Sequence, residues 1–199
     1  MKVIGLCGGS GSGKSIVSKC FLNRGIPSLD TDAVYHAMVE NDSECSRTLI
    51  NEFGDSIKNS KGGVNRKVLA RIVFGFDSES KLKRLNSISH FYILKTCREW
   101  LAEQESKGVK AAIIDAPVLF ESGFNSECDI TVAVISSFDL RVKRIVARDG
   151  MTEEKAKKRI KSQADDEFLI KNADYVIYNN TTEQELDLQV EKICRLILR

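Results

Sequence analysis

The sequence lacks any long uninterrupted run of apolar residues. The apolar segment nearest the N-terminus, MKVIGLC, is short and is followed at once by two glycines. It is too short for the core of a signal peptide or for a membrane span. Of the 199 residues, 42% are hydrophobic, which is enough apolar material for one domain with a full core. We therefore expect a soluble, cytoplasmic protein that is not bound to a membrane.

The sequence also lacks a dominant block of like charge. Charged residues make up 29% of the chain, yet the net charge is only +2. The richest basic stretch, residues 155–161, directly follows two glutamates, which is typical of a solvated helix face. We therefore expect small-molecule partners and no nucleic acid. We also expect a monomer or a weak oligomer.

Paired cysteines are missing as well. The six cysteines include no CxxC pair, and neither histidine lies beside a cysteine, so the spacing argues against a zinc site. Several cysteines lie within apolar runs, such as Cys7 in VIGLC and Cys194 in EKICRLIL. We expect them to be small buried side chains in a reducing compartment.

What the sequence does contain is a series of short apolar runs, several of them rich in valine and isoleucine. Near-continuous apolarity of this kind is typical of parallel strands that are covered on both faces. Helical patterns lie between the runs, so we expect an α/β domain: a five-stranded parallel sheet with helices on both faces. The expected strands are Lys2–Cys7, Ile26–Leu29, Ala111–Asp115, Ile130–Ile135 and Tyr175–Tyr178.

Two segments do not fit a simple strand–helix alternation. Residues 33–110 are too long for one crossover and are expected to form a helical, substrate-binding insertion. Residues 151–165 form a smaller charged insertion, with Thr152 as a plausible N-cap. The nucleotide-binding core then comprises residues 1–32, 111–150 and 166–199. The helices expected within the long insertion are Glu44–Phe53, Arg66–Phe74 and about Phe91–Lys107, and a last helix with an apolar stripe is expected after Thr182.

The most specific motif is Gly8–Ser15, GGSGSGKS, which matches the pattern GxxxxGK[ST]. It directly follows an expected strand and precedes a helical pattern over Ile16–Arg24. Backbone N–H groups of such a loop, together with the helix N-terminus, cradle phosphates. Lys14 is expected to contact the β- and γ-phosphates, and Ser15 to bind Mg²⁺. The motif predicts binding of a nucleoside triphosphate with Mg²⁺.

The loop alone leaves three classes of protein open: a small-molecule kinase, a GTPase or ATPase, and a regulatory protein that senses nucleotide. The sequence has no Asn-Lys-x-Asp segment for reading guanine and no LSGGQ-like signature of transport ATPases. A chain of 199 residues also leaves little room for a motor apparatus. A kinase is therefore the favoured class.

Carboxylates follow the expected strands at the edge where ligands bind in open parallel sheets. Asp30 and Asp32 follow the second strand, and either could take the proton of an acceptor hydroxyl. We favour Asp32, which could also cap the next helix. Asp115 ends the third strand and could hold the hydration shell of Mg²⁺ or cap a loop. Glu121 is placed for substrate contact.

Arginines complete the pattern. Arg144 and Arg148 are spaced i, i+4 on the helix expected after the fourth strand, so they face the same way. Arg159 lies in the charged insertion, which we expect to act as a lid. Guanidinium groups can neutralise the charge that develops on the γ-phosphate oxygens. Any one of these arginines could also be an ordinary surface residue.

The order and spacing of these pieces resemble the dephospho-coenzyme A kinase family along almost the whole chain. GLCGGSGSGKS is close to the family's GLTGGIGSGKS, and DAPVLFE corresponds to its PLLFE segment. The other matching pieces are LDTDAVYH, His90, Arg144 with Arg148-Asp149, the lid residues Arg159 and Gln163, and ADYVIYNN with Asn179. The chain departs from the family at Phe91, where proline is usual, and at Leu169, where a basic residue is usual.

The resemblance implies an ATP-dependent kinase that phosphorylates the ribose 3′-hydroxyl of dephospho-coenzyme A. It also implies the strand order 2-3-1-4-5, a lid, and Asp32 as the general base. The remaining alternatives are another P-loop kinase of the shikimate or gluconate type and a non-catalytic nucleotide sensor. The expected ATP-binding residues are Gly9, Gly11, Ser12, Gly13, Lys14, Ser15, Ile16, Arg148 and Asn179. The expected substrate-binding residues are Asp32, His90, Pro117, Leu119 and Glu121. The expected catalytic residues are Asp32, Lys14, Arg144 and Arg148. The expected metal ligands are Ser15 and Asp115.

Overall fold

The computed structural model describes residues 1–75 and 78–198, and it divides into two compact units. The first unit comprises residues 1–29 and 101–199, and the second comprises residues 30–100. The helical insertion was expected at residues 33–110, so the second unit begins slightly earlier and ends earlier than that prediction. Among the described helices, none is both long enough and apolar enough to cross a membrane.

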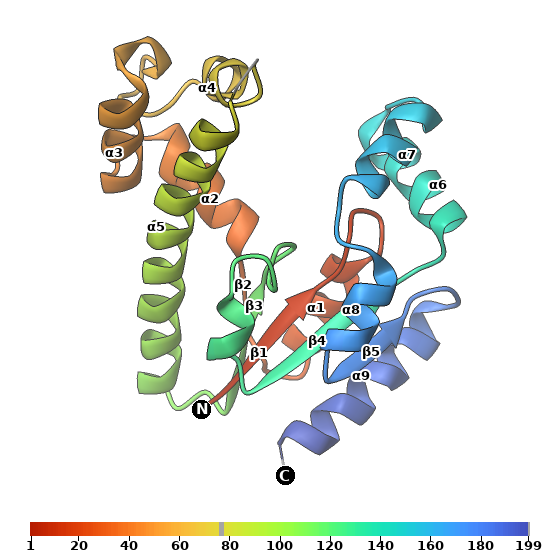
Figure 1. Cartoon of the computed structure of the whole chain (residues 1–199). Coiled ribbons are helices and arrows are strands. Elements are labelled where there is room, and N and C mark those ends of the chain that lie inside the picture. Colours follow the sequence, from red (N-terminus) through yellow and green to blue (C-terminus); the bar gives the residue numbers. More distant parts are fainter. Residues whose placement is uncertain (76–77, 199) are drawn as a thin grey trace. The chain divides into compact units, whose positions relative to one another are not determined.

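The first unit is built on a parallel sheet of five strands in the order β2-β3-β1-β4-β5, which confirms the predicted fold class and strand order (Figure 1). Four predicted strands have the predicted bounds. The second starts later than predicted because Pro27, which has no N–H for the ladder, stays outside it. The strands are β1 (Lys2–Cys7), β2 (Ser28–Asp30), β3 (Ala111–Asp115), β4 (Ile130–Ile135) and β5 (Tyr175–Tyr178).

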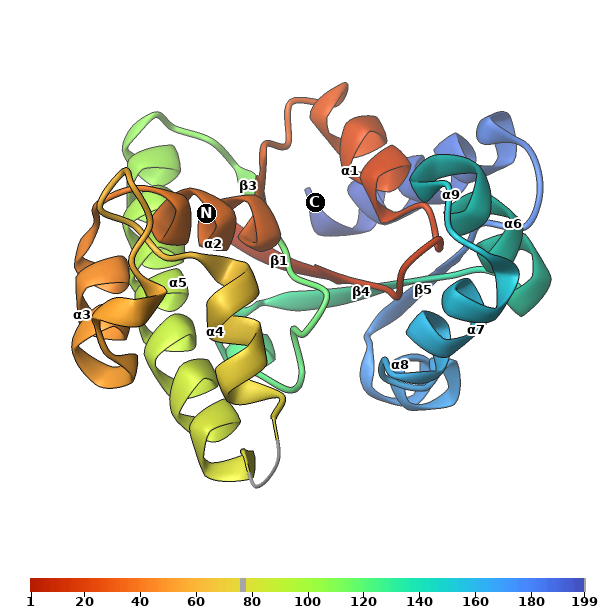
Figure 2. The ribbon, with the colours of Figure 1, turned by 90° about the horizontal axis from the view of Figure 1, so that it is seen from above.

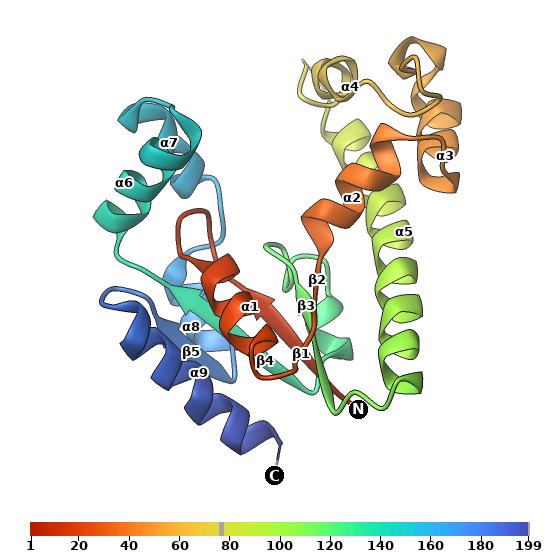
Figure 3. The same cartoon turned by 180° about the vertical axis from the view of Figure 1, so that it is seen from behind.

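Helices cover both faces of this sheet. The helices α1 (Lys14–Leu22) and α9 (Glu183–Ile197) lie on one face, which is nearer the viewer in Figure 3. The short helix α8 (Asp166–Asn172) lies on the other face, and the 3₁₀ turn η2 (Phe124–Glu127) contacts β1. Because both faces are covered, the central strands β1, β3 and β4 are mostly apolar and buried, as their sequences indicated.

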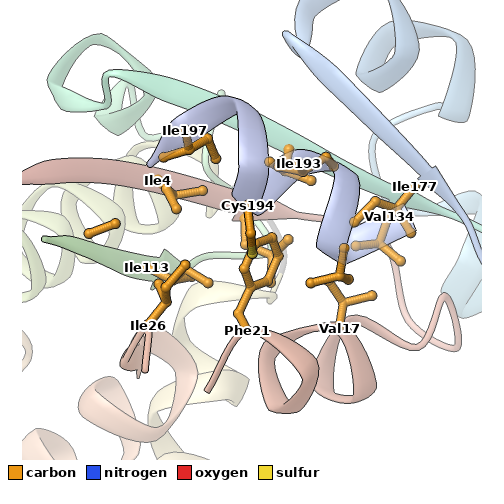
Figure 4. Packing of buried hydrophobic residues seen from close by; sticks show 14 of the residues in the cluster. Ile4, Val17, Phe21, Ile26, Ile113, Val134, Ile177, Ile193, Cys194 and Ile197 are labelled. Carbon is orange, nitrogen blue, oxygen red and sulfur yellow. The ribbon is translucent and has the colours of Figure 1, made fainter. Parts of the chain in front are cut away.

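The main core lies between the sheet and the pair α1 and α9. Figure 4 shows Val17 and Phe21 of α1 among the side chains of the strands and of α9. Thr182 caps α9 by accepting a hydrogen bond from the Glu185 N–H, as predicted. The predicted apolar stripe of α9 is buried in this core, and it consists of Leu186, Val190, Ile193, Cys194 and Ile197.

Two further helices follow β4. The helix α6 (Phe138–Asp149) packs on α7 (Glu153–Lys161) through a small apolar cluster of its own. The hydroxyl of Thr152 accepts a hydrogen bond from the Lys155 N–H, which confirms it as the N-cap of α7. The charged segment predicted from the sequence is therefore a helix docked on α6.

The second unit is helical, and α2, α3 and α4 lie beside the long helix α5 (Figure 2). The prediction for α3 is confirmed, but the prediction that a helix starts near Phe91 is wrong. That helix, α5, starts at Glu79, because Leu82, Leu85 and Ile88 continue its apolar stripe towards the N-terminus. The elements are α2 (Thr31–Glu40), α3 (Glu44–Phe53), η1 (Asp55–Ile57), α4 (Arg66–Val73) and α5 (Glu79–Ser106).

Candidate active site

The loop between β1 and α1 has a backbone that only glycine can follow at its key positions. Gly11 has φ = 79°, and a Cβ there would lie 2.7 Å from the carbonyl oxygen of Arg141. The Ser12 N–H donates to the Gly9 carbonyl at 3.1 Å, which closes a tight turn. Gly13 precedes α1 and has no side chain to cap it. The N-terminus of α1 is thus open towards an anion, as in known phosphate loops.

Lys14 lies in the first turn of α1 and pairs with Asp115 at the end of β3. The hydroxyl of Ser18, one helical turn further along α1, donates to the other carboxylate oxygen of Asp115 at 3.1 Å. Asp115 is only 6% exposed, so both contacts stabilise a nearly buried carboxylate. Ser18 was not predicted from the sequence. Its spacing of i, i+4 from Lys14 was the signal, because it places both side chains on one face of α1.

Asn179 and Arg144 hold the loop from the side of α6 and β5. The Asn179 side chain donates to the Ser12 carbonyl at 2.8 Å. Arg144 donates to the carbonyls of Gly11 and Ser12 at 3.2 and 3.4 Å and to the Asn179 carbonyl at 3.1 Å. These contacts show that Arg144 supports the loop backbone. Its direct role in catalysis, and the nucleotide contact of Asn179, remain predictions.

Arg148 and Arg159 meet at one carboxylate. Arg148 donates to both oxygens of Asp149 at 2.7 and 2.9 Å, and Arg159 of α7 donates to Asp149 at 2.9 Å. The hydrogen bonds from Arg148, with a further contribution from Arg159, lower the pKa of Asp149. The exposed residue Asp149 thus accepts hydrogen bonds from two guanidinium groups that belong to different helices.

Arg141, which the sequence analysis did not single out, is the most buried charged group near the loop, with 3% of its surface exposed. It donates to the Ser10 carbonyl, to Asp166 and to Gln163. Gln163, predicted as a lid residue, in turn accepts from the Ser10 N–H at 2.8 Å. One weak signal for Arg141 was present in the sequence: it precedes Arg144 by three residues, on the same helix face.

The segment after β3 carries the other residues predicted to contact substrate. Leu119 is fully buried, and its side chain packs against Gly5, so it belongs to the core. Pro117 is partly exposed and Glu121 is exposed. Cys7, at the end of β1, is also buried, and burial raises the pKa of its thiol to about 12. The contacts of Pro117, Leu119 and Glu121 with substrate remain predictions.

Two predicted residues lie in the second unit. The side chain of Asp30 accepts hydrogen bonds from the N–H groups of Asp32 and Ala33, so Asp30 is the N-cap of α2. The suggestion that Asp32 caps this helix is therefore wrong. Asp32 lies in the first turn of α2, with its side chain exposed. His90 lies on α5, where partial burial lowers its pKa and favours the neutral imidazole.

Comparisons with known proteins agree on one family. The family model for dephospho-CoA kinase matches residues 2–185 of the chain. A dephospho-CoA kinase from Fusobacterium nucleatum is 39% identical over 195 residues, which is 98% of this chain and 98% of the relative. One from Corynebacterium efficiens is 38% identical over 195 residues, covering 98% and 96%.

Solved structures also align with the chain over nearly its full length. The crystal structure of TT1252 from Thermus thermophilus aligns with a TM-score of 0.81 at 28% identity, covering 98% of this chain and 97% of the other. A dephospho-CoA kinase from Campylobacter jejuni aligns with a TM-score of 0.71 at 26% identity, covering 99% and 98%. A shikimate kinase from Acinetobacter baumannii reaches a TM-score of 0.54 at 18% identity, covering 100% and 93%, and so shares the fold alone.

Proposed function

Since the chain belongs to the dephospho-CoA kinase family, we propose that it transfers the γ-phosphoryl group of ATP to the ribose 3′-hydroxyl of dephospho-CoA. The observation that carries the proposal is the family match over residues 2–185, joined to a fully formed phosphate loop at Gly8–Ser15. The hydroxyl oxygen attacks the γ-phosphorus, and the bond to the β-phosphate oxygen breaks. The products are coenzyme A and ADP.

The phosphates of ATP bind at the loop and at the N-terminus of α1. The partial positive charge of this helix end and the N–H groups of the loop attract the anion. Lys14 adds a full positive charge, and its partner Asp115 keeps the ammonium group beside the loop. Charge on the transferring group is thereby stabilised as it spreads over the γ-phosphate oxygens.

The residues at the loop fit Mg²⁺. Mg²⁺ prefers oxygen ligands and is commonly held by one or two carboxylates together with substrate phosphates. Ser15 offers an exposed hydroxyl at the start of α1, and Asp115 offers a carboxylate anchored by Ser18. No group of three or more His, Cys, Asp or Glu side chains suited to a metal occurs among residues 1–75 and 78–198. When bound, Mg²⁺ would neutralise charge on the β- and γ-phosphates.

Asp32 takes the proton of the 3′-hydroxyl. Asp30 is engaged as the N-cap of α2, whereas Asp32, two residues later in the first turn, presents its carboxylate to solvent. An exposed carboxylate at this position is open to a bound hydroxyl and can accept its proton. This division of tasks supports Asp32 as the base over Asp30.

Arg144 and Arg148 neutralise the developing charge, and Arg159 of the lid segment lies beside Arg148 at Asp149. Arg144 also supports the loop that holds the phosphates. The guanidinium groups of Arg148 and Arg159 keep directed N–H donors beyond those given to Asp149, because each guanidinium carries five. His90 recognises the acceptor as a neutral hydrogen-bonding group, since burial lowers its pKa. Buried cysteines outside any disulfide, such as Cys7 and Cys45, are typical of a reducing compartment and support a location in the cytoplasm.

An acceptor panel tests the proposal. The purified chain is incubated with ATP labelled in the γ-phosphoryl group, Mg²⁺, and dephospho-CoA, shikimate or gluconate in separate reactions. We expect label on dephospho-CoA alone. Label on shikimate or gluconate would assign the chain to another kinase class. ATP binding without acceptor-dependent release of ADP would make it a nucleotide sensor.

A further inference from the structure

A buried arginine fixes the tip of the phosphate loop. Arg141 lies in the first turn of α6, and only 3% of its surface is exposed. Its Nε donates to the Ser10 carbonyl at 3.0 Å, and one terminal nitrogen pairs with Asp166 at 2.8 Å. The other terminal nitrogen donates to Gln163 Oε1 at 3.3 Å. One guanidinium therefore joins the loop to the segment between α7 and α8.

Gln163 binds the same loop residue twice. Its Oε1 accepts from the Ser10 N–H at 2.8 Å, and its Nε2 donates to the Ser10 hydroxyl at 3.2 Å. Because Arg141 also contacts Gln163, the N–H, the carbonyl and the hydroxyl of Ser10 all depend on this pair of side chains. Ser10 is one of the two central residues of the turn that the hydrogen bond from Ser12 to Gly9 closes.

The hydrogen bond from Arg141 to the Ser10 carbonyl also determines the direction of the Gly11 N–H group. In a trans peptide the C=O and the following N–H point in opposite directions. The Ser10 carbonyl faces Arg141, so the Gly11 N–H is turned away from α6. In the alternative type of β-turn, the peptide between Ser10 and Gly11 would face the other way, and the third residue of the turn, Gly11, would have different φ and ψ angles. Gly11, with φ = 79°, has the angle that the observed orientation requires.

The same principle applies two residues later. Asn179 holds the Ser12 carbonyl at 2.8 Å, which turns the Gly13 N–H in the opposite direction. N–H groups of a loop that face a common concavity make it attractive to an anion. Arg141 thus acts on the Ser10–Gly11 peptide as Asn179 acts on the Ser12–Gly13 peptide.

We infer that Arg141 is a positioning residue for nucleotide binding: by holding the Ser10 carbonyl, it orients the Gly11 N–H towards the phosphates. Asp166 holds the guanidinium, and Gln163 holds the remaining polar groups of Ser10. This inference rests on the proposed binding of ATP at Gly8–Ser15. Arg141 acts through the loop and touches no substrate itself.

The test compares two substitutions on α6. Arg141→Lys keeps the positive charge but cannot donate in three fixed directions. Lys143→Met removes a charge from the exposed side of the same helix and serves as the control. For both variants and the unmodified chain, isothermal titration calorimetry gives the Kd for ADP and for pyrophosphate, each with Mg²⁺. Thermal denaturation gives Tm, and steady-state kinetics give KM and kcat.

We expect Arg141→Lys to weaken ADP and pyrophosphate binding by the same factor of about 10, because the lost contact acts on phosphate alone. KM for ATP should rise by that factor, with KM for the acceptor unchanged. Lys143→Met should change either Kd by less than about twofold, as for other exposed charges. A lower Tm for Arg141→Lys with an unchanged Kd for ADP would overturn the inference.

If Arg141→Lys does not fold, Asp166→Asn provides the test, because the Asp166 side chain is 32% exposed and tolerates loss of charge more readily. It should weaken ADP binding in the same direction, and Asp166→Glu should restore part of the affinity. An unchanged Kd in Asp166→Asn would overturn the inference. A chain that binds ADP but does not phosphorylate dephospho-CoA would contradict the proposed function alone, because the Kd values still decide the role of Arg141.

Discussion

Replacing Ser18 with alanine tests whether Asp115 is held in place from α1. The Ser18 hydroxyl donates to Asp115 at 3.1 Å, and a hydrogen bond to a charged group contributes about 1.5–3 kcal/mol. Alanine regains about 0.5 kcal/mol through its higher helix propensity. We therefore expect the free energy of unfolding to fall by about 1–2.5 kcal/mol. In a chain of 199 residues this lowers Tm by about 2–10 °C.

Thermal denaturation followed by circular dichroism measures this change. Ser87→Ala is the matched control, because Ser87 is an exposed serine within α5. The same loss should raise the Mg²⁺ concentration needed for half-maximal activity by about 10-fold, since residues that orient a metal ligand typically have effects of this size. If Ser18→Ala matched Ser87→Ala in Tm and in its Mg²⁺ requirement, the anchoring of Asp115 by Ser18 would be refuted.

Two further substitutions test the base and an ion pair. Asp32→Asn should lower kcat by about 10²- to 10⁴-fold, the usual effect of losing a general base, with the Kd for ADP unchanged by calorimetry; near-normal turnover would exclude Asp32 as the base. Asp187 accepts hydrogen bonds from Arg24 at 2.6 and 2.7 Å, and these lower its pKa from the usual 3.8. The pair therefore stabilises the fold above pH 3.8 and is lost as the pH falls through the lowered pKa. Asp187→Asn should lower Tm at pH 7, with the difference from the unmodified chain shrinking at acid pH; an equal difference at both pH values would contradict this.

The sheet could be predicted from the sequence because its strands are buried on both faces. Ile113 and Val134 belong to apolar runs that leave little choice of element or position. The long helix α5 was harder, because it begins with the polar stretch ESKLKRLNSISH. Its apolar residues are spaced three apart there, which is a weaker signal than the continuous runs of the strands. The strand order came from the family resemblance.

The site was predictable where a motif fixes both sequence and backbone. The Gly8–Ser15 pattern was enough by itself to identify the phosphate loop, since few sequences permit that backbone. The roles of Ser18 and Arg141 could not be predicted from the sequence, because they depend on partners 97 and 131 residues away in the chain. Likewise, the sequence suggested Asp32 as a cap of the next helix, because an aspartate at either position can cap it, and only the backbone shows that Asp30 does so.

The position of the transferred phosphoryl group tests the central claim most directly. The product formed from ATP and dephospho-CoA can be isolated and examined by phosphorus–proton correlation NMR. We predict that the new phosphorus couples to the proton on the ribose 3′ carbon, and that the product is coenzyme A. A phosphoryl group at any other position, or no new phosphorus signal while ATP is bound, would contradict the proposed reaction.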